Sequence, residues 1–258
     1  MTDLFEEVEE QLRSDRYRAL ARKAAPWILA LAAAALVIAL GIWGWQQYQQ
    51  QISDKASEQY SAAAEAMAAG DHAKAAKLWG DVSTSSSKAY KTLALMQLGA
   101  LKLGAQPADT KGAVALFDQA ASAAPDDILG DAARLKSALA ILDTAPYAEM
   151  EGRLTPLLKD GHPYRVQARE ALAFAKLLKG DQAGARGDFV VISASLDSPE
   201  GARQRAKAAM DLIDSGSAKA VPAVVKAAQS LPQPMLVGPG GVPIGLAPQS
   251  QQDAAPQQ

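Results

Sequence analysis

Two stretches of the chain, GDHAKAAKLWGDV at residues 70–82 and GDQAGARGDFVVI at residues 180–192, share one pattern. In each, an alanine follows the Gly-Asp pair four residues after the aspartate, and an aromatic residue follows four residues after that alanine. Glycine ends helices and aspartate caps them, so each pair predicts a tight turn between two helices. Positions four apart share a helix face, where the alanine lets another helix approach and the ring fills the space beside it.

A third copy of this pattern runs from Ala113 to Pro125. We predict that six residues of the three copies carry the packing between helices: Ala75, Trp79, Ala113, Phe117, Ala185 and Phe189. Small residues on the preceding helices stand at matching offsets: Ala63, Gly99 and Ala173. The spacing resembles the tetratricopeptide repeat, a helix pair that stacks into an α-solenoid. The copies are degenerate, with a period of about 37 residues across 54–195 instead of the repeat's usual 34.

Helical periodicity, broken by turns rich in glycine, proline and aspartate, continues along most of the chain. We expect helices at 55–69, 72–82, 88–103, 109–123, 127–143, 147–159, 163–179, 181–194, 199–213 and 217–230. The predicted fold class is therefore all-α, with a tetratricopeptide-like domain over 54–231. Residues 232–258 are rich in proline and glutamine and have no periodic apolar face, which predicts a disordered tail.

Residues 24–53 contain no charged side chain, and the stretch Trp27–Trp45 is almost wholly apolar. Nineteen helical residues span roughly 28 Å, close to the thickness of the hydrocarbon core of a bilayer. Trp27 stands at one edge and Trp43 and Trp45 at the other, where aromatic rings favour the headgroups. We therefore predict a transmembrane signal anchor at 26–46. A stripe of small residues on it would allow another membrane helix to approach closely, either in a dimer or in a docked partner. The stripe consists of Ala32, Ala35 and Ala39.

Five basic residues precede the anchor in residues 1–25, whereas Lys55 is the only one in the twenty-five residues after Trp45. Basic flanks stay in the cytoplasm, so we expect a cytoplasmic N-terminal segment and an exported C-terminal domain. A cleaved signal peptide is the alternative. The apolar core is long and ends in bulky tryptophans where a cleavage site needs small residues, which favours an anchor that is retained.

Composition argues against several classes of function. The chain has 26 Lys and Arg against 28 Asp and Glu, so nothing suggests the basic surface that nucleic acids require. It has no cysteine, and its two histidines, His72 and His162, stand in predicted surface turns without further ligands or a catalytic partner. We expect no enzyme activity, no metal and no cofactor.

The order of a charged lead, one anchor and a degenerate repeat domain resembles the YfgM family, an ancillary subunit of the bacterial SecYEG translocon. Residues 177–186 (LLKGDQAGAR) resemble the late repeat of that family, and 41–45 (GIWGW) resemble the exit of its anchor. The resemblance implies a single-pass protein of the bacterial inner membrane with a periplasmic domain. It also implies association with SecYEG, with a PpiD-type chaperone and with exported client proteins. The tail at 232–258 departs from the shorter ending of that family.

A second reading uses the same solenoid differently. A concave surface of stacked helix pairs binds protein segments of many kinds, so the alternative function is an adaptor for cell-envelope assembly or division machinery. An enzyme or transporter component is a third reading. A single anchor without charges inside the membrane cannot form a transport pathway alone.

Overall fold

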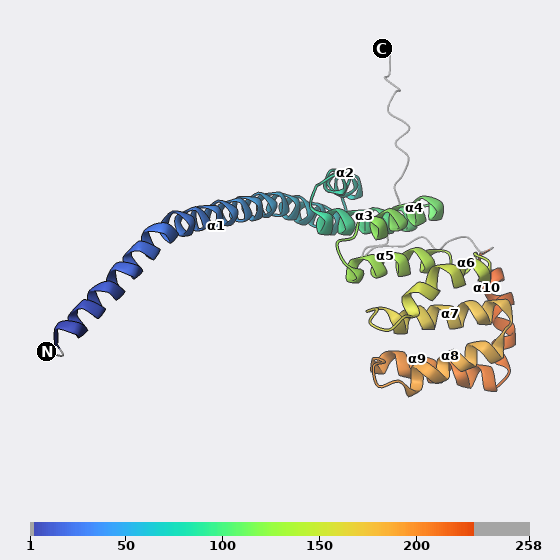
Figure 1. Cartoon of the computed structure of the whole chain (residues 1–258). Helices are drawn as coiled ribbons and strands as arrows, with labels where there is room; N and C mark the ends of the chain where they lie inside the picture. The colour runs from blue at the N-terminus through green and yellow to red at the C-terminus, as the bar shows by residue number, and fades with distance from the viewer. Residues whose placement is uncertain (1–2, 230–258) are drawn as a thin grey trace, which may run out of the picture. The chain divides into compact units, whose positions relative to one another are not determined.

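The structure is a computed structural model that describes the backbone of residues 3–229, and side chains from Pro26 onward except those of Ile28, Leu29 and Ala32. Within residues 3–229 every element is a helix and none is a strand (Figure 1). The chain divides into two compact units between Asp54 and Lys55. The predicted tail at 232–258 lies outside the described residues.

The first unit contains most of helix α1 (Asp3–Ala68), which includes Pro26 and the whole of the predicted anchor. Every described side chain from Ala33 to Gln51 is exposed. Trp27 is 78% exposed, and Trp43 and Trp45 are each 65% exposed. Among the residues whose side chains the structure describes, no helical stretch is both long and apolar enough to cross a membrane. Ala32 of the predicted stripe lies outside the described side chains, while Ala35 and Ala39 are exposed.

The second unit begins with the last turns of α1 and continues through nine α-helices and two short 3-10 turns in its described part (Figure 1). Their bounds are α2 (His72–Ser83), α3 (Lys88–Gly104), α4 (Thr110–Ala123), α5 (Asp127–Ala140), α6 (Tyr147–Leu154), η1 (Thr155–Leu158), α7 (Arg165–Lys179), α8 (Gln182–Ala194), α9 (Glu200–Asp214), η2 (Ser217–Ala220) and α10 (Val221–Gln229). From α2 to α9, the helices pack mainly on the helices next to them along the chain. Such nearest-neighbour stacking defines an α-solenoid.

The two Gly-Asp pairs form the same turn in two places. Gly70 and Gly180 have φ angles of +81° and +89°, a left-handed conformation that glycine adopts without strain. The next residue caps the following helix in both cases. The Asp71 carboxylate accepts a hydrogen bond from the Lys74 N–H at 3.0 Å, and that of Asp181 accepts one from the Gly184 N–H at 2.9 Å. Both predicted turns are therefore confirmed in detail.

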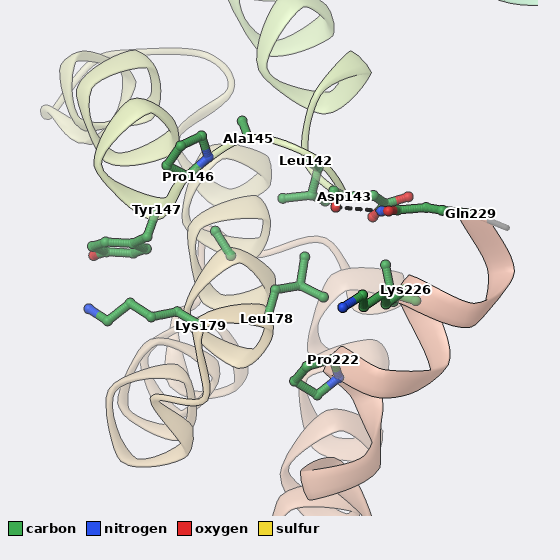
Figure 2. A pocket seen from close by; sticks show the side chains of 12 residues that line it. Leu142, Asp143, Ala145, Pro146, Tyr147, Leu178, Lys179, Pro222, Lys226 and Gln229 are labelled. Atoms are coloured by element: carbon green, nitrogen blue, oxygen red, sulfur yellow. Dashed lines mark hydrogen bonds between the residues drawn. The ribbon is translucent and has the colours of Figure 1, made fainter.

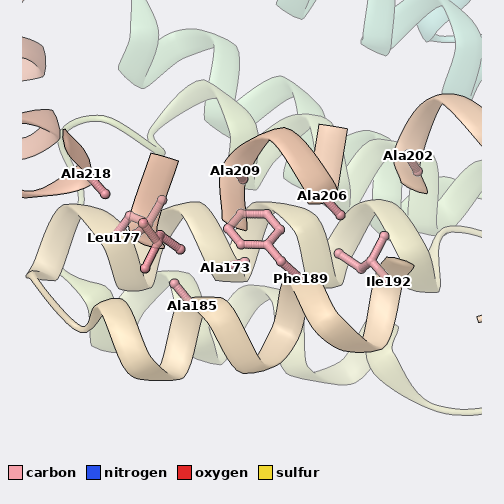
Figure 3. Close-up of a cluster of buried hydrophobic side chains, with 10 residues drawn as sticks. Ala173, Leu177, Ala185, Phe189, Ile192, Ala202, Ala206, Ala209 and Ala218 are labelled. Carbon is pink, nitrogen blue, oxygen red and sulfur yellow. The ribbon is translucent and has the colours of Figure 1, made fainter. Parts of the chain in front are cut away.

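The repeated alanine and aromatic positions all lie in the cores between helices. Each of the residues Ala75, Trp79, Ala113, Phe117, Ala185 and Phe189 is at most 3% exposed. The Phe189 ring lies among alanines of α7 and α9, next to Ile192 (Figure 3). Phe117 packs on Gly99 so closely that a Cβ atom added there would lie 2.7 Å from the ring.

Several predicted helices end differently in the structure. The helix expected at 55–69 is the continuation of α1, and the one expected at 127–143 ends at Ala140. The helix expected at 147–159 ends at Leu154 and continues as the 3-10 turn η1, because Pro156 has no N–H to donate. In place of an aromatic ring, Leu157 fills this repeat together with the fully buried Met150 and Leu154.

A polar cluster joins three helices of the middle repeats. From α6, the Arg153 guanidinium donates hydrogen bonds to Asp118 of α4 at 3.0 Å, to the hydroxyl of Ser137 of α5 at 2.9 Å and to Glu149 at 3.1 Å. Ser137 also donates to Asp118 at 2.6 Å. Burial opposes the charge of Arg153, but the hydrogen bonds and charges of Asp118 and Glu149 prevail and raise its pKa.

Gly99→Ala tests the close contact between α3 and Phe117. We expect it to lower the free energy of unfolding by about 1–2 kcal/mol, because overpacking outweighs the gain in helix propensity. Gly187→Ala is the matched control, since this exposed position in α8 has open space around it. That control should raise the free energy of unfolding by about 0.5–1 kcal/mol. Urea unfolding followed by circular dichroism measures both, and stabilisation by Gly99→Ala would contradict the packing described here.

Arg153→Ala tests the polar cluster. We expect the free energy of unfolding to fall by about 1–2 kcal/mol. This loss is smaller than is usual for charged hydrogen bonds, because Asp118 is partly exposed and water screens its charge. Arg186→Ala removes an exposed pair with Asp214 and should leave the urea midpoint nearly unchanged. Equal effects of the two substitutions would show that the cluster does not hold the three helices together.

Candidate protein-interaction groove

A groove of about 460 Å³ opens in the second unit between α7, α10 and the connection from α5 to α6 (Figure 2). The last turn of α7 contributes Leu178 and Lys179, and the connection contributes Leu142 to Pro146. The remaining wall comes from α10, which reaches this place by folding back past α8 and α9 to contact α7. The groove therefore brings together segments that lie as many as 87 residues apart, from Leu142 to Gln229.

Most of the groove wall is apolar. On α7, Ala175 is buried and Leu178 is half-buried, and on α10 Pro222 and Val225 are half-buried. Leu178 points from α7 into the space between the walls (Figure 2). No side chain of α10 is fully buried, so this helix leaves apolar surface available to a further segment. The apolar wall suits a partner that buries aliphatic or proline side chains.

Tyr147 and Lys179 form one end of the groove. The Lys179 ammonium lies 3.9 Å from the centre of the Tyr147 ring, a cation–π contact. The Tyr147 hydroxyl donates a hydrogen bond to Glu151 at 3.0 Å. Burial, followed by this hydrogen bond, raises the pKa of Tyr147 to about 12, so the phenol stays neutral at physiological pH. The ring thus offers an uncharged aromatic surface.

Gln229 and Lys226 bring polar groups to the other end. The Gln229 side-chain amide donates a hydrogen bond to the backbone carbonyl of Asp143 at 2.6 Å, which fixes the end of α10 to the opposite wall (Figure 2). Lys226 is exposed at the rim, and no ion pair involving it is described. A few polar groups around an apolar wall are typical of sites that bind a peptide in one orientation.

A smaller hollow of about 130 Å³ lies between α7 and α8. Arg165 and Arg169 line it, but both already pair with carboxylates. Arg165 pairs with Asp160 and Asp197, and Arg169 pairs with Asp188, which also accepts a hydrogen bond from Lys176 at 2.7 Å. Because its cations are paired and it is small, this hollow is a weaker candidate for binding than the groove.

The two histidines stand in separate places of the second unit, His72 at the start of α2 and His162 in the turn before α7. His162 lies in a turn, as expected, but its side chain is half-buried. Its Nδ1 lies 2.6 Å from the carboxylate of Asp131, which is fully buried and also accepts a hydrogen bond from Arg134 at 2.9 Å. His162 thus ties the turn before α7 to α5. Among the side chains that the structure describes, from Pro26 onward, no three or more His, Cys, Asp or Glu lie close enough together to hold a metal ion.

None of the predicted packing residues or anchor residues lines the groove. The alanine and aromatic positions hold the solenoid from inside, and the described anchor residues belong to the first unit. Sequence reasoning missed the groove because its walls are distant along the chain. One signal was present: Pro146 and Pro222 each stand at the start of a helix and bring rigid apolar surface to one place.

A family model of a tetratricopeptide repeat-like domain matches residues 22–227. Neither the curated proteins nor the solved structures gave a match. The matched range covers most of the chain and includes every residue that lines the groove except Gln229. The stacked helix pairs, the repeated Gly-Asp turns and this match agree, and the chain belongs to the tetratricopeptide repeat-like domain family.

Proposed function

We propose that the chain is a membrane-anchored scaffold that assists exported proteins beside the Sec translocon of a bacterial inner membrane. The coarse part of this function follows from the family, because tetratricopeptide repeat-like domains mediate protein partnerships and are generally not catalytic. The observation that best supports the proposal is the groove on the solenoid, because its apolar surface can bind a protein segment.

The proposed membrane anchor rests on the residues of α1 around Leu36. The run at 24–53 is free of charge, and every described side chain from Ala33 to Gln51 is exposed. A helix that is apolar on all sides is stable where something apolar surrounds it, and lipid meets that need. Tryptophans near both ends of the run and the basic residues before it support a span with a cytoplasmic N-terminus and a periplasmic domain.

The proposed partners follow from that membrane location and from the resemblance to the YfgM family. A scaffold held close to the membrane meets exported chains as they emerge, when their apolar segments are still unfolded. The proposed partners are therefore SecYEG, a PpiD-type chaperone and exported clients. An adaptor for cell-envelope assembly or division would use the same surface, and the identity of the captured proteins separates the two functions.

Leu36→Asp combined with Ile38→Asp tests the anchor. Each acidic residue near the centre of a span costs about 2.5–3.5 kcal/mol, so we expect the double variant to leave the carbonate-washed membrane fraction. Leu196→Asp is the control, because Leu196 is 93% exposed in the helical domain and should not affect membrane retention. Retention of both variants in the membrane would exclude this segment as the anchor.

Cysteine labelling tests the orientation, since the chain has no cysteine of its own. In spheroplasts, a membrane-impermeant maleimide should label Ser86→Cys, whose position in the second unit is exposed, and should not label Ser14→Cys until the membrane is opened. The reverse pattern would place the helical domain in the cytoplasm and rule out a role in handling exported proteins.

Affinity capture of the full chain in mild detergent tests the partners. SecY or a periplasmic folding factor should be recovered with the wild-type chain and lost with the Leu36→Asp, Ile38→Asp variant. Leu196→Asp should recover them normally. Recovery of division or envelope-assembly proteins instead would favour the adaptor function, and a preparation with none of these would contradict both.

A further inference from the structure

We propose that the groove binds a segment of this same chain, the proline-rich stretch at 231–247, and that a partner must displace it. The stretch lies outside the described residues, and its sequence is LPQPMLVGPGGVPIGLA. This inference concerns what binds in the groove. It holds whether or not the chain is anchored in a membrane and whether or not the Sec translocon is its partner.

The first argument is the position of the last described residue. Gln229 lines the groove, and its hydrogen bond to the Asp143 carbonyl holds the end of α10 at the groove's edge. Residue 231 is therefore only two positions from the groove wall. An extended proline-rich chain advances about 3.1 Å per residue, so five residues cover roughly 15 Å, enough to cross a groove of this size.

The second argument is that α10 needs a cover. It is the last described helix of the solenoid, and terminal repeats usually present a polar outer face to water. Instead, Pro222 and Val225, which line the groove, are only half-buried, and no residue of α10 is fully buried. A nine-residue helix is marginal by itself in water, so further apolar contacts would stabilise it.

The third argument is chemical complementarity. Residues 230–250 contain no charge and alternate proline with aliphatic side chains, which match the apolar wall formed by Pro146, Leu178 and Pro222. Proline-rich segments are also recognised by aromatic surfaces and by donors that reach their free carbonyl groups. The Tyr147 ring supplies the aromatic surface, and the Lys226 ammonium at the rim supplies such a donor.

Attachment to α10 makes the binding effective even when the contacts are weak. A short flexible linker gives a local concentration in the millimolar range, so the segment occupies the groove ahead of any dilute competitor. A partner then binds in proportion to the fraction of chains whose groove is open. A client protein therefore binds only if its affinity and concentration are high enough to displace the segment.

A cysteine pair in the full chain tests this inference, because no native cysteine interferes. Ala145→Cys places one thiol on the groove wall between α5 and α6, which is far along the chain from the proline-rich stretch. Gly238→Cys places the other thiol in that stretch. The matched control carries the same two cysteines but has 231–237 replaced by a glycine-serine sequence of equal length. Under diamide, the native stretch should form the intramolecular disulfide at least about tenfold faster than the control. Equal rates would overturn the proposal.

Two further measurements complete the test. First, chains carrying only Ala145→Cys are mixed with chains carrying only Gly238→Cys. Binding within one chain is supported if the double variant gives a crosslinked monomer and the mixture gives little crosslinked dimer. If dimer predominates in the mixture, the groove binds the stretch of a second copy instead. Second, hydrogen exchange should show that α10 and residues 142–147 are less protected in the glycine-serine variant. A synthetic 231–247 peptide should restore that protection, and no effect of the peptide would contradict binding at this groove.

Discussion

The second unit depends on one contact that recurs in it, a large ring set against a small residue of a neighbouring helix. Phe117 on Gly99 shows it most sharply, since not even a methyl group fits between them. Trp79 shares a buried cluster with Ala63, and Phe189 shares one with Ala173. A small residue lets the backbones of two helices approach, and the ring then fills the remaining space, so neither residue stabilises the pair without the other. The spacing between successive helices follows from this contact.

Because the stacked helices contact mainly their neighbours, the polar interactions between them matter for register. Arg153, Ser137 and Asp118 connect α4, α5 and α6, where the ring of the other repeats is replaced by leucine and methionine. His162 and Asp131 do the same between α5 and the turn before α7. The repeat that departs most from the pattern in apolar packing is thus also joined to its neighbours by polar links. Hydrogen-bonded side chains there help to specify the alignment of the helices.

The sequence predicts most of this fold because its decisive signals are local. The Gly-Asp turns, the aspartate caps and the ring four residues after an alanine all depend on residues within one or two helical turns, and the structure has them where they are expected. Prediction fails where distant segments meet. Nothing near His162 indicates the buried Asp131, and nothing near Leu142 indicates that α10 will lie beside it. Pro156, which stands inside the helix expected at 147–159, is the local signal for the early end of α6 and for the 3-10 turn that follows.

The return of α10 has a consequence for how the solenoid unfolds. In a linear array of repeats, the terminal pair is the first to fray, because it has a neighbour on one side only. Here the chain after α9 goes back to α7, and Gln229 is tied to a carbonyl 86 residues earlier. Helix α10 thus closes a loop of structure that contains α8 and α9. Fraying of this end must begin with the release of α10 from α7 and of Gln229 from Asp143, and α9 and α8 can separate from α7 only after that.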